Sequence, residues 1–398
     1  MNLRLLDEGE DFMGEQKMRV LYITSDMLPW EVHGVTVHLK YLAECMSKKA
    51  DVTVLYTCPN QQTGENIGYE LQNGVRVLTI PNVISKLNLN FASNTPNGWI
   101  KASFPLTQCW KSVEELLEHE KFDIVHFQDY YAAFAIEAVK SKTKAKIVTT
   151  IHALSRKDQH ISAGIRQWLI SNSDAVISVS QWASQYISQR FNLFNAQLKT
   201  IYNGTTMRYV KSDKRDLITF SGRLETKKGC DILLQALAKI GKETIQSKGL
   251  SVLIMGDGSE KERLQDMAYS LGLSEVCTFM GQLHQSQVEA YLSRSLVHAV
   301  PSREEVFGLS SIEAMAKGAY TIVSSVDGLP ESVVEKHLGC IIENEDVNGL
   351  SEAILQHINN PLCEEKRLQY ARIVSERFSW EYVADETYKL YLELIKSI

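Results

Sequence analysis

Residues 217–240 read LITFSGRLETKKGCDILLQALAKI. The run opens with a short apolar segment, passes through a loop that contains glycine and several charged residues, and ends in a segment whose apolar positions recur at helical spacing. This pattern predicts a β-strand, a loop and an α-helix in that order. A strand followed by a helix is the building unit of parallel sheets that are covered by helices.

The same unit recurs along the rest of the chain. Further strand-like runs occupy residues 18–25, 51–57, 74–81, 122–128, 145–153, 175–180, 198–204, 251–256, 276–281, 296–302, 320–325 and 339–343. The runs are mostly apolar, which is typical of strands buried on both faces of a parallel sheet. The polar segment 205–216 follows Asn203-Gly204 and divides the runs into two series. We therefore predict two doubly wound, Rossmann-like α/β domains that face each other across a cleft.

The length of 398 residues supports two domains, because a single hydrophobic core rarely grows beyond roughly 250–300 residues. We expect a loose, acidic leader over residues 1–17 and an N-terminal domain over residues 18–205. A C-terminal domain follows over residues 206–378. The final segment 379–398 predicts an amphipathic closing helix, which can cap the C-terminal domain or cross back to the N-terminal one.

The composition excludes several classes of protein. The formal net charge of −6 argues against a nucleic-acid partner. Seven scattered cysteines without a C-x-x-C pair indicate reduced thiols and no zinc site. No stretch approaches the ~20 continuous apolar residues that cross a bilayer. The expected location is the cytoplasm, with peripheral association with the inner membrane face as an alternative.

Ligands of open parallel sheets bind beyond the carboxyl ends of the strands, so residues that follow strand-like runs are the first candidates for a site. Gly34 precedes a predicted helix, where its missing side chain lets the backbone approach an anion. An ordinary turn is the alternative for this glycine. The adjacent His33 is assigned to the acceptor or sugar side of the site, together with His126 and Asp129 at the end of another run. A structural histidine whose hydrogen bonds are satisfied within the fold is the alternative for His126. His152 ends the next run and can hold a sugar hydroxyl.

The loop 221–229 carries Gly222, Arg223 and Lys228. The side chains of Arg223 and Lys228 can bind the same diphosphate. The planar guanidinium of the arginine donates several hydrogen bonds, and the ammonium group of the lysine acts as a compact positive charge. The loop lacks the G-x-x-x-x-G-K-[ST] form of nucleoside triphosphatases, which favours diphosphate recognition over triphosphate cleavage. A solvated basic loop is the alternative.

Residues 301–318, PSREEVFGLSSIEAMAKG, predict a helix that begins near Gly308. The amides around Phe307, Gly308 and Leu309 would then face a phosphate. Glu305 in the preceding loop is suited to accept hydrogen bonds from sugar hydroxyls, and Glu313 in the second turn from ribose hydroxyls. A helix-dipole partner is the alternative for Glu313.

A retaining glycosidase would also use two carboxyl groups, about 5–5.5 Å apart. A hydrolase of plain glycosides does not need the cations of loop 221–229 or a helix N-terminus in the same cleft. The phosphate-type features therefore count against a glycosidase.

Glu305 and Glu313 at the spacing E-x7-E, with Phe307-Gly308-Leu309 between them, resemble glycosyltransferase family 4 and its glycogen-synthase relatives. The resemblance covers nearly the whole chain. It includes Gly222-Arg223-Leu224 with Lys228-Gly229, Asn203-Gly204, Gly256-Asp257-Gly258 and Gly328-Leu329-Pro330-Glu331.

This resemblance implies a GT-B fold, a nucleotide bound mainly by the C-terminal domain, and transfer with retention at the anomeric carbon without a metal or other cofactor. Arg223 and Lys228 match the family's diphosphate-stabilising pair. Glu305 matches its donor-sugar ligand, Glu313 its ribose ligand and His152 its sugar-contacting histidine.

Two positions depart from the family pattern. The chain has His33-Gly34 where relatives often have paired glycines, and Glu31 where starch and glycogen synthases have lysine. Both differences argue against a glucan synthase that uses ADP-glucose. The irregular stretch 82–106 lies where an acceptor would enter the cleft, with a variable surface excursion as the alternative.

We therefore predict a retaining glycosyltransferase that moves a hexose from a nucleoside-diphosphate sugar to a glycan or lipid-linked acceptor. UDP-glucose or another UDP-hexose is the favoured donor, and cell-envelope polysaccharide biosynthesis the expected role. The alternatives are a GT-B sugar-nucleotide epimerase and a non-catalytic sugar-nucleotide-binding scaffold.

Overall fold

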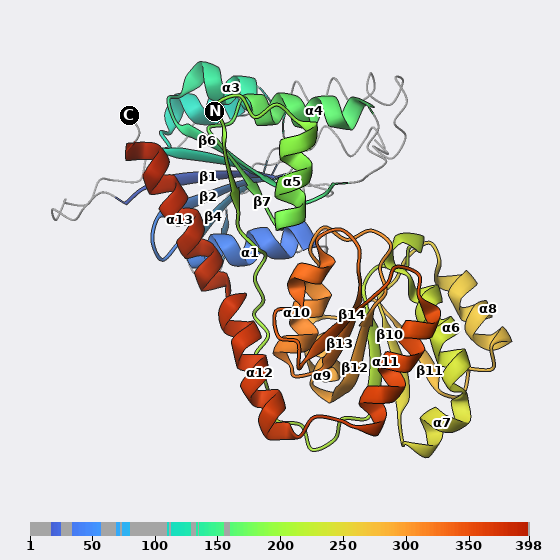
Figure 1. Cartoon of the computed structure of the whole chain (residues 1–398). Helices are drawn as coiled ribbons and strands as arrows, with labels where there is room; N and C mark the ends of the chain where they lie inside the picture. Colours follow the sequence, from blue (N-terminus) through green and yellow to red (C-terminus); the bar gives the residue numbers. More distant parts are fainter. Residues whose placement is uncertain are drawn as a thin grey trace.

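The computed structural model describes residues 17–24, 34–56, 69–71, 74–79, 110, 113–128, 133, 135–154 and 160–396. Within these residues the chain forms two sheets in separate parts of the molecule, and helices cover both faces of each (Figure 1). The predicted α/β class with two Rossmann-like domains is confirmed. The expected leader, except Lys17, and the stretch 82–106 lie outside the described residues.

The N-terminal sheet has the strand order β3-β4-β2-β1-β5-β6-β7-β8. Its neighbouring strands are parallel except for β3, which pairs antiparallel with β4 at the edge. The strands are β1 Arg19–Thr24, β2 Asp51–Tyr56, β3 Tyr69–Leu71, β4 Val75–Thr79, β5 Ile124–Gln128, β6 Lys146–Ile151, β7 Ala175–Ser178 and β8 Gln197–Thr200.

The C-terminal sheet is parallel throughout its described strands, in the order β11-β10-β9-β12-β13-β14. The chain therefore reverses its direction of travel across the sheet between β9 and β12, which is where open α/β sheets bind ligands. The strands are β9 Leu217–Ser221, β10 Ser251–Met255, β11 Cys277–Gly281, β12 Ser295–Val300, β13 Tyr320–Ser324 and β14 Gly339–Ile342.

Helices alternate with these strands and cover the sheets. The N-terminal part has α1 Gly34–Met46, α3 Ile136–Lys142, α4 His160–Ser171 and α5 Gln181–Arg190. The C-terminal part has α6 Cys230–Ile240, α7 Lys242–Ser247, α8 Lys261–Ser270, α9 Gln285–Arg294, α10 Leu309–Ala316, α11 Val347–Asn359 and α12 Glu364–Arg377, with short 3₁₀ turns η2 Thr226–Lys228 and η3 Leu329–Ser332. The last helix is α13 Trp380–Lys396.

Strand β1 illustrates why the strands are apolar at consecutive positions. Val20 and Tyr22 contribute to the core on one face of the sheet, where α1 and α13 pack. Leu21 and Ile23 contribute to the core on the opposite face, with Ile136 of α3. Because successive side chains of a strand point to opposite faces, both faces can be buried only if every position is apolar.

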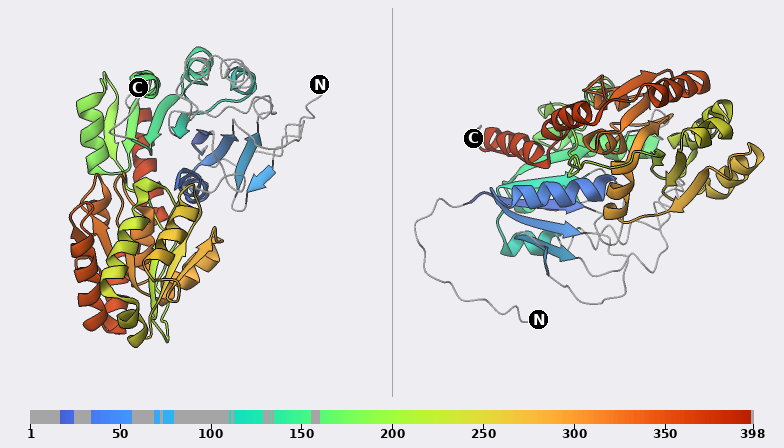
Figure 2. Two further views of the ribbon diagram at one scale, coloured as in Figure 1. Left: turned by 90° about the vertical axis from the view of Figure 1, so that its right-hand side faces the viewer. Right: turned by 90° about the horizontal axis from the view of Figure 1, so that it is seen from below.

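The last helix crosses from the C-terminal domain back to the N-terminal one. Figure 1 shows α12 beside α10 of the C-terminal domain and α13 continuing along the N-terminal sheet, and Figure 2 shows these red helices from two other sides. Trp380 at the start of α13 is only 2% exposed and lies edge-on to His38 and stacked on Tyr41 of α1, with ring centroids 5.2 and 5.9 Å away. The closing helix thus belongs to the N-terminal core.

The chain passes between the two domains twice, near Thr205 and near Phe378, and these two segments lie side by side. The backbone N–H of Thr205 donates to the carbonyl of Phe378 at 2.7 Å. A Cβ added to Gly204 would lie 2.6 Å from Cδ2 of Trp380, so a larger residue at this position would displace the indole. The crossings therefore form one packed hinge between the domains.

Trp380→Ala is expected to lower the free energy of unfolding by about 3–5 kcal/mol, because it removes a buried aromatic side chain and leaves a cavity. The matched control is Tyr382→Ala on the same helix, where the tyrosine is 51% exposed and the expected change is within about 0.5 kcal/mol. Urea denaturation followed by far-UV circular dichroism measures both changes. Equal effects of the two substitutions would contradict the packing of Trp380 in the N-terminal core.

Candidate active site

Two loops leave neighbouring strands on either side of the reversal point, residues 222–229 after β9 and residues 301–308 after β12. The loops touch, because the backbone N–H of Arg303 donates to the carbonyl of Lys227 at 2.7 Å. The guanidinium of Arg303 also donates to both carboxylate oxygens of Asp231 on α6, at 2.9 and 2.8 Å. This bidentate pair fixes the second loop against the first.

Lys228 and Glu305 meet where these loops converge. Their side chains form an ion pair at 2.5 Å and are only 22% and 17% exposed. Partial burial makes the contact stronger than a surface pair, because less water screens the charges. The structure therefore brings together two of the residues that the sequence assigned to diphosphate and sugar.

Arg223 does not join this pair. Its guanidinium lies 2.8 Å from a carboxylate oxygen of Glu225 and is 58% exposed, and Lys227 bonds the other oxygen at 2.9 Å. Burial by itself would raise the pKa of Glu225, but the hydrogen bond from Lys227 and the nearby cations lower it below its ordinary value. Glu225 was not predicted as a partner from the sequence, although it lies two residues after the arginine.

Helix α10 begins directly beside the Lys228–Glu305 pair. Gly308 precedes it at a φ of 91°, a left-handed conformation that favours glycine. The first amides of any helix lack partners within the helix and carry its positive dipole end. The Phe307 ring is 2% exposed and stacks on Tyr202 at 5.5 Å, so residue 307 offers the site only its backbone.

The N-terminal end of α1 faces the same place from the other domain. A Cβ added to Gly34 would lie 3.4 Å from Cδ1 of Leu309, the first residue of α10. In the C-terminal domain, Gly222 adopts a φ of 155°, and its carbonyl oxygen lies 1.9 Å from a Cβ added to Gly256. The Gly34–Leu309 contact therefore brings two helix N-termini together across the domain boundary.

Glu313 lies in the second turn of α10, as its spacing predicts. Gln285 donates an amide hydrogen bond to its carboxyl oxygen at 3.4 Å. Desolvation raises the pKa of Glu313 to about 7, and the hydrogen bond from Gln285 opposes this rise. Burial of the carboxyl group therefore favours its neutral form.

His152 follows β6 on the N-terminal side of the site. Its Nε2 lies 2.8 Å from Oε1 of Gln128, and its ring packs edge-on to His38 at 4.5 Å between centroids. His38 is 3% exposed, its Nδ1 lies 2.8 Å from Oδ1 of Asn203, and burial lowers its pKa to about 4. His38 was not predicted from the sequence as a neighbour of His152, because it lies on the apolar face of a predicted helix.

The expectation for His126 is corrected by the structure. Its ring is fully buried, with Nδ1 2.5 Å from the Tyr391 hydroxyl and Nε2 2.7 Å from Oγ1 of Thr150. Burial, with a smaller effect of His38, lowers the pKa of His126 well below its ordinary value. His126 therefore joins β5 to α13 inside the core and has no free nitrogen for an acceptor.

His33 and Asp129 lie outside the described residues. Within the described ranges, no cluster of three or more His, Cys, Asp or Glu side chains is arranged to hold a metal ion. The same part of the chain contains no helix that is long and apolar enough to cross a bilayer.

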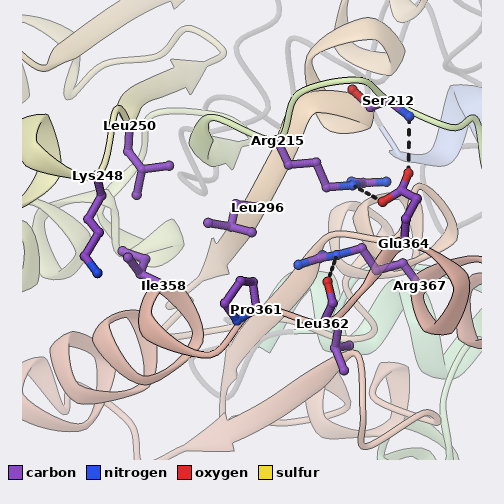
Figure 3. A pocket seen from close by; sticks show the side chains of 10 residues that line it. All are labelled: Ser212, Arg215, Lys248, Leu250, Leu296, Ile358, Pro361, Leu362, Glu364 and Arg367. Carbon is purple, nitrogen blue, oxygen red and sulfur yellow. Dashed lines mark hydrogen bonds and ion pairs between the residues drawn. The ribbon is translucent and has the colours of Figure 1, made fainter.

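A cavity of about 370 Å³ lies at the opposite end of α10 (Figure 3). Two of its lining residues, Arg215 and Arg367, donate to the carbonyls of Lys317 and Gly318 at 2.9 and 2.7 Å. These carbonyls follow the last turn of α10, where cations stabilise the negative dipole end. The two arginines therefore hold the C-terminal end of α10 in place.

Comparisons with known proteins identify the family of the chain. Residues 32–208 match the family described as Glycosyltransferase Family 4, and residues 207–375 match Glycosyl transferases group 1. The glycogen synthase of Mycobacterium tuberculosis is 25% identical over 397 residues and 94% of each chain is covered.

Solved structures share the fold. The sucrose-phosphate synthase of Thermosynechococcus elongatus superposes with a TM-score of 0.77 at 20% identity, covering 96% of this chain and 100% of the other. The HepE protein of Anabaena in complex with UDP superposes with a TM-score of 0.71 at 18% identity, covering 94% and 100%.

The two domains and the loops between them thus define a GT-B glycosyltransferase. The chain belongs to glycosyltransferase family 4.

Glu313→Gln is expected to stabilise the protein increasingly as pH rises. Below about pH 4.5 the carboxyl group is protonated in both folded and unfolded chains, so the variant and the wild type differ little. Between about 4.5 and 7 the unfolded carboxyl ionises before the folded one, so the wild type loses stability while the glutamine variant does not. Above about pH 7 the difference is constant.

The melting temperature of both proteins from pH 5 to pH 8 measures this effect. The glutamine side chain of the variant keeps an oxygen that can accept the hydrogen bond from Gln285. A difference that does not change across this range would show that the Glu313 carboxyl is not desolvated.

Proposed function

We propose that this glycosyltransferase transfers a hexose from a UDP-hexose, such as UDP-glucose, to a glycan or lipid-linked acceptor with retention of the anomeric configuration. The observation that carries the proposal is the partly buried Lys228–Glu305 pair beside two helix N-termini from opposite domains. The pair thus combines a positive charge that suits a diphosphate with a carboxylate that suits sugar hydroxyls.

Lys228 and Glu305 are bonded to each other in the structure. A bound donor replaces this contact with two others. The ammonium group of Lys228 and the first amides of α10 stabilise the negative charge on the leaving diphosphate. The carboxylate of Glu305 accepts hydrogen bonds from the sugar hydroxyls. Lys228 exchanges the carboxylate for the charged diphosphate, and Glu305 exchanges the ammonium group for several hydroxyl donors, so neither group is left buried without a partner.

The remaining residues complete the donor site. Arg223, which is 58% exposed, has room to turn from Glu225 toward the diphosphate. Glu313 binds the ribose hydroxyls in its ionised form, and His152 contacts the sugar from the N-terminal domain. Positive charge from Lys228, Arg223 and the helix N-termini substitutes for a metal ion in this scheme.

Retention follows from attack on the face that the leaving group occupies. The acceptor oxygen forms a bond to the anomeric carbon as the bond from that carbon to the diphosphate oxygen breaks. The acceptor proton passes to the departing diphosphate. No protein residue becomes covalently attached to the sugar in this scheme.

The proposed donor carries a uridine nucleotide, and the proposed role is in the assembly of cell-envelope polysaccharide. The HepE protein of Anabaena has been crystallised with UDP and glucose, which supports a uridine donor by analogy of fold. Its identity of 18% makes this a guide to the choice of ligands to test.

Nucleotide sugars are expected to raise the melting temperature as their concentration rises, because they bind only the folded protein. A panel of UDP-, GDP- and ADP-sugars tests the base, and UDP-glucose is expected to give the largest shift. Absence of any shift across the panel would refute the proposed donor site. Formation of an epimerised nucleotide sugar without release of UDP would identify an epimerase instead.

Lys228→Ala is expected to lower kcat by about 10²–10³-fold, because it removes a cation that stabilises the leaving diphosphate. Lys227→Ala is the matched control: it removes the same charge from the neighbouring residue, whose side chain is 41% exposed and bonds Glu225. Release of UDP from UDP-glucose in the presence of acceptor extracts measures both rates. Similar losses in the two variants would indicate a general effect of charge rather than a contact with the diphosphate.

A further inference from the structure

Glu331 joins the two domains through its side chain. It lies in η3, which follows β13 of the C-terminal domain. Its carboxylate oxygens accept hydrogen bonds from the backbone N–H groups of Gln181 and Trp182, both at 2.7 Å. These residues begin α5 of the N-terminal domain, so a carboxylate of one domain caps a helix of the other. Such charge-assisted bonds at a positive helix end are strong.

The segment that carries Glu331 also holds the loop of Glu305. The backbone N–H of Glu305 donates to Oδ2 of Asp327 at 3.2 Å, and the carbonyl of Glu305 accepts from the N–H of Gly328 at 3.2 Å. Further along, the hydroxyl of Ser311 on α10 donates to the hydroxyl of Ser332 at 2.6 Å. Residues 327–332, called the bridging segment below, therefore contact the loop before α10 and α10 itself.

The bridging segment has no free space between the domains. A Cβ added to Gly328 would lie 2.0 Å from the carbonyl oxygen of Val306 and 2.6 Å from Oγ of Ser180, which caps α5. Gly328 is therefore packed between the loop that contains Glu305 and the start of α5.

A hydrogen-bonded tyrosine adds to this connection. The pKa of Tyr202 is raised to about 12, by burial first and then by the charge and hydrogen bond of Glu331. Its ring stacks on Phe307, next to the start of α10. Glu331 thus contacts α5 and the chain near the hinge at once.

We propose that Glu331 is a positioning residue that couples occupation of the donor site to closure of the two domains. Sugar binding at Glu305 is transmitted through Asp327 and Gly328 to the carboxylate of Glu331, which holds α5 in the closed arrangement. The proposal rests on the proposed function, because it takes Glu305 as the ligand of the donor sugar. Coupling of this kind makes the closed contact and the bound donor stabilise each other equally.

Two variants break the contact from opposite sides. Glu331→Gln keeps the shape of the side chain but removes its charge and one of its two acceptor oxygens. Gln181→Pro removes one of the two donors. Proline is well suited to the first position of a helix, and the preceding Ser180 already has the extended conformation that proline requires, with φ −157° and ψ 160°. Both variants are therefore expected to fold.

Glu352→Gln is the matched control. It makes the same change in charge in the same domain, at an exposed residue of α11 away from the bridging segment. Isothermal titration with UDP-glucose measures donor affinity, and amide hydrogen exchange of residues 182–190 reports closure of the domains on α5.

In the wild type and the control, UDP-glucose is expected to slow exchange at the start of α5. In Glu331→Gln and Gln181→Pro this slowing is lost, and UDP-glucose binds about tenfold more weakly. A purely structural role would raise exchange equally with and without ligand and would leave the affinity unchanged.

The outcomes separate this inference from the function on which it rests. If wild-type protein binds UDP-glucose and the two variants bind it equally well with the same ligand-dependent protection, Glu331 does not couple the domains. If the wild type binds neither UDP-glucose nor UDP, the donor site itself is wrong and both proposals fail.

Discussion

Helix α10 is held in place at both of its ends, and the proposed donor site depends on this constraint. Arg215 and Arg367 bond the carbonyls that follow its last turn, and buried Phe307 anchors the chain just before it. A helix N-terminus is useful to an anion only if it does not move when the anion binds, since a preorganised dipole costs no reorganisation during reaction. The buried arginines and the aromatic anchor supply that rigidity.

The domain boundary is arranged around the same helix. The start of α1 meets α10 at Gly34 and Leu309, and η3 reaches from α10 to α5 through Glu331. On the far side, the crossings at Thr205 and Phe378 are bonded to each other and buried beneath Trp380. The hinge is thus apolar and tightly packed, whereas the contacts near the donor site are polar. Polar contacts can exchange for a ligand, and a packed apolar hinge resists such exchange.

The candidate site could be predicted in part from sequence. Glu305, Gly308 and Glu313 belong to one continuous stretch whose apolar spacing fixes where the helix begins, so their places followed from local pattern alone. Lys228 was assigned to the diphosphate without its partner, because the ion pair with Glu305 joins residues far apart in the chain. Arg223 was expected beside Lys228, but its guanidinium bonds Glu225 instead. His126 was expected at the cleft, but α13 returns across the sheet and buries it against Tyr391.

The sequence by itself determined the alternation of strands and helices, the two domains and the loops that carry the proposed donor-site residues. These features depend on residues close together in the chain, where periodicity and turn residues act directly. Only the tertiary structure decided which charges pair, which histidine is buried and which domain α13 covers. Those outcomes depend on packing between segments that are distant in the chain. The neighbours of a residue in such packing are set by how the sheets and helices pack together, and its position in the sequence does not reveal them.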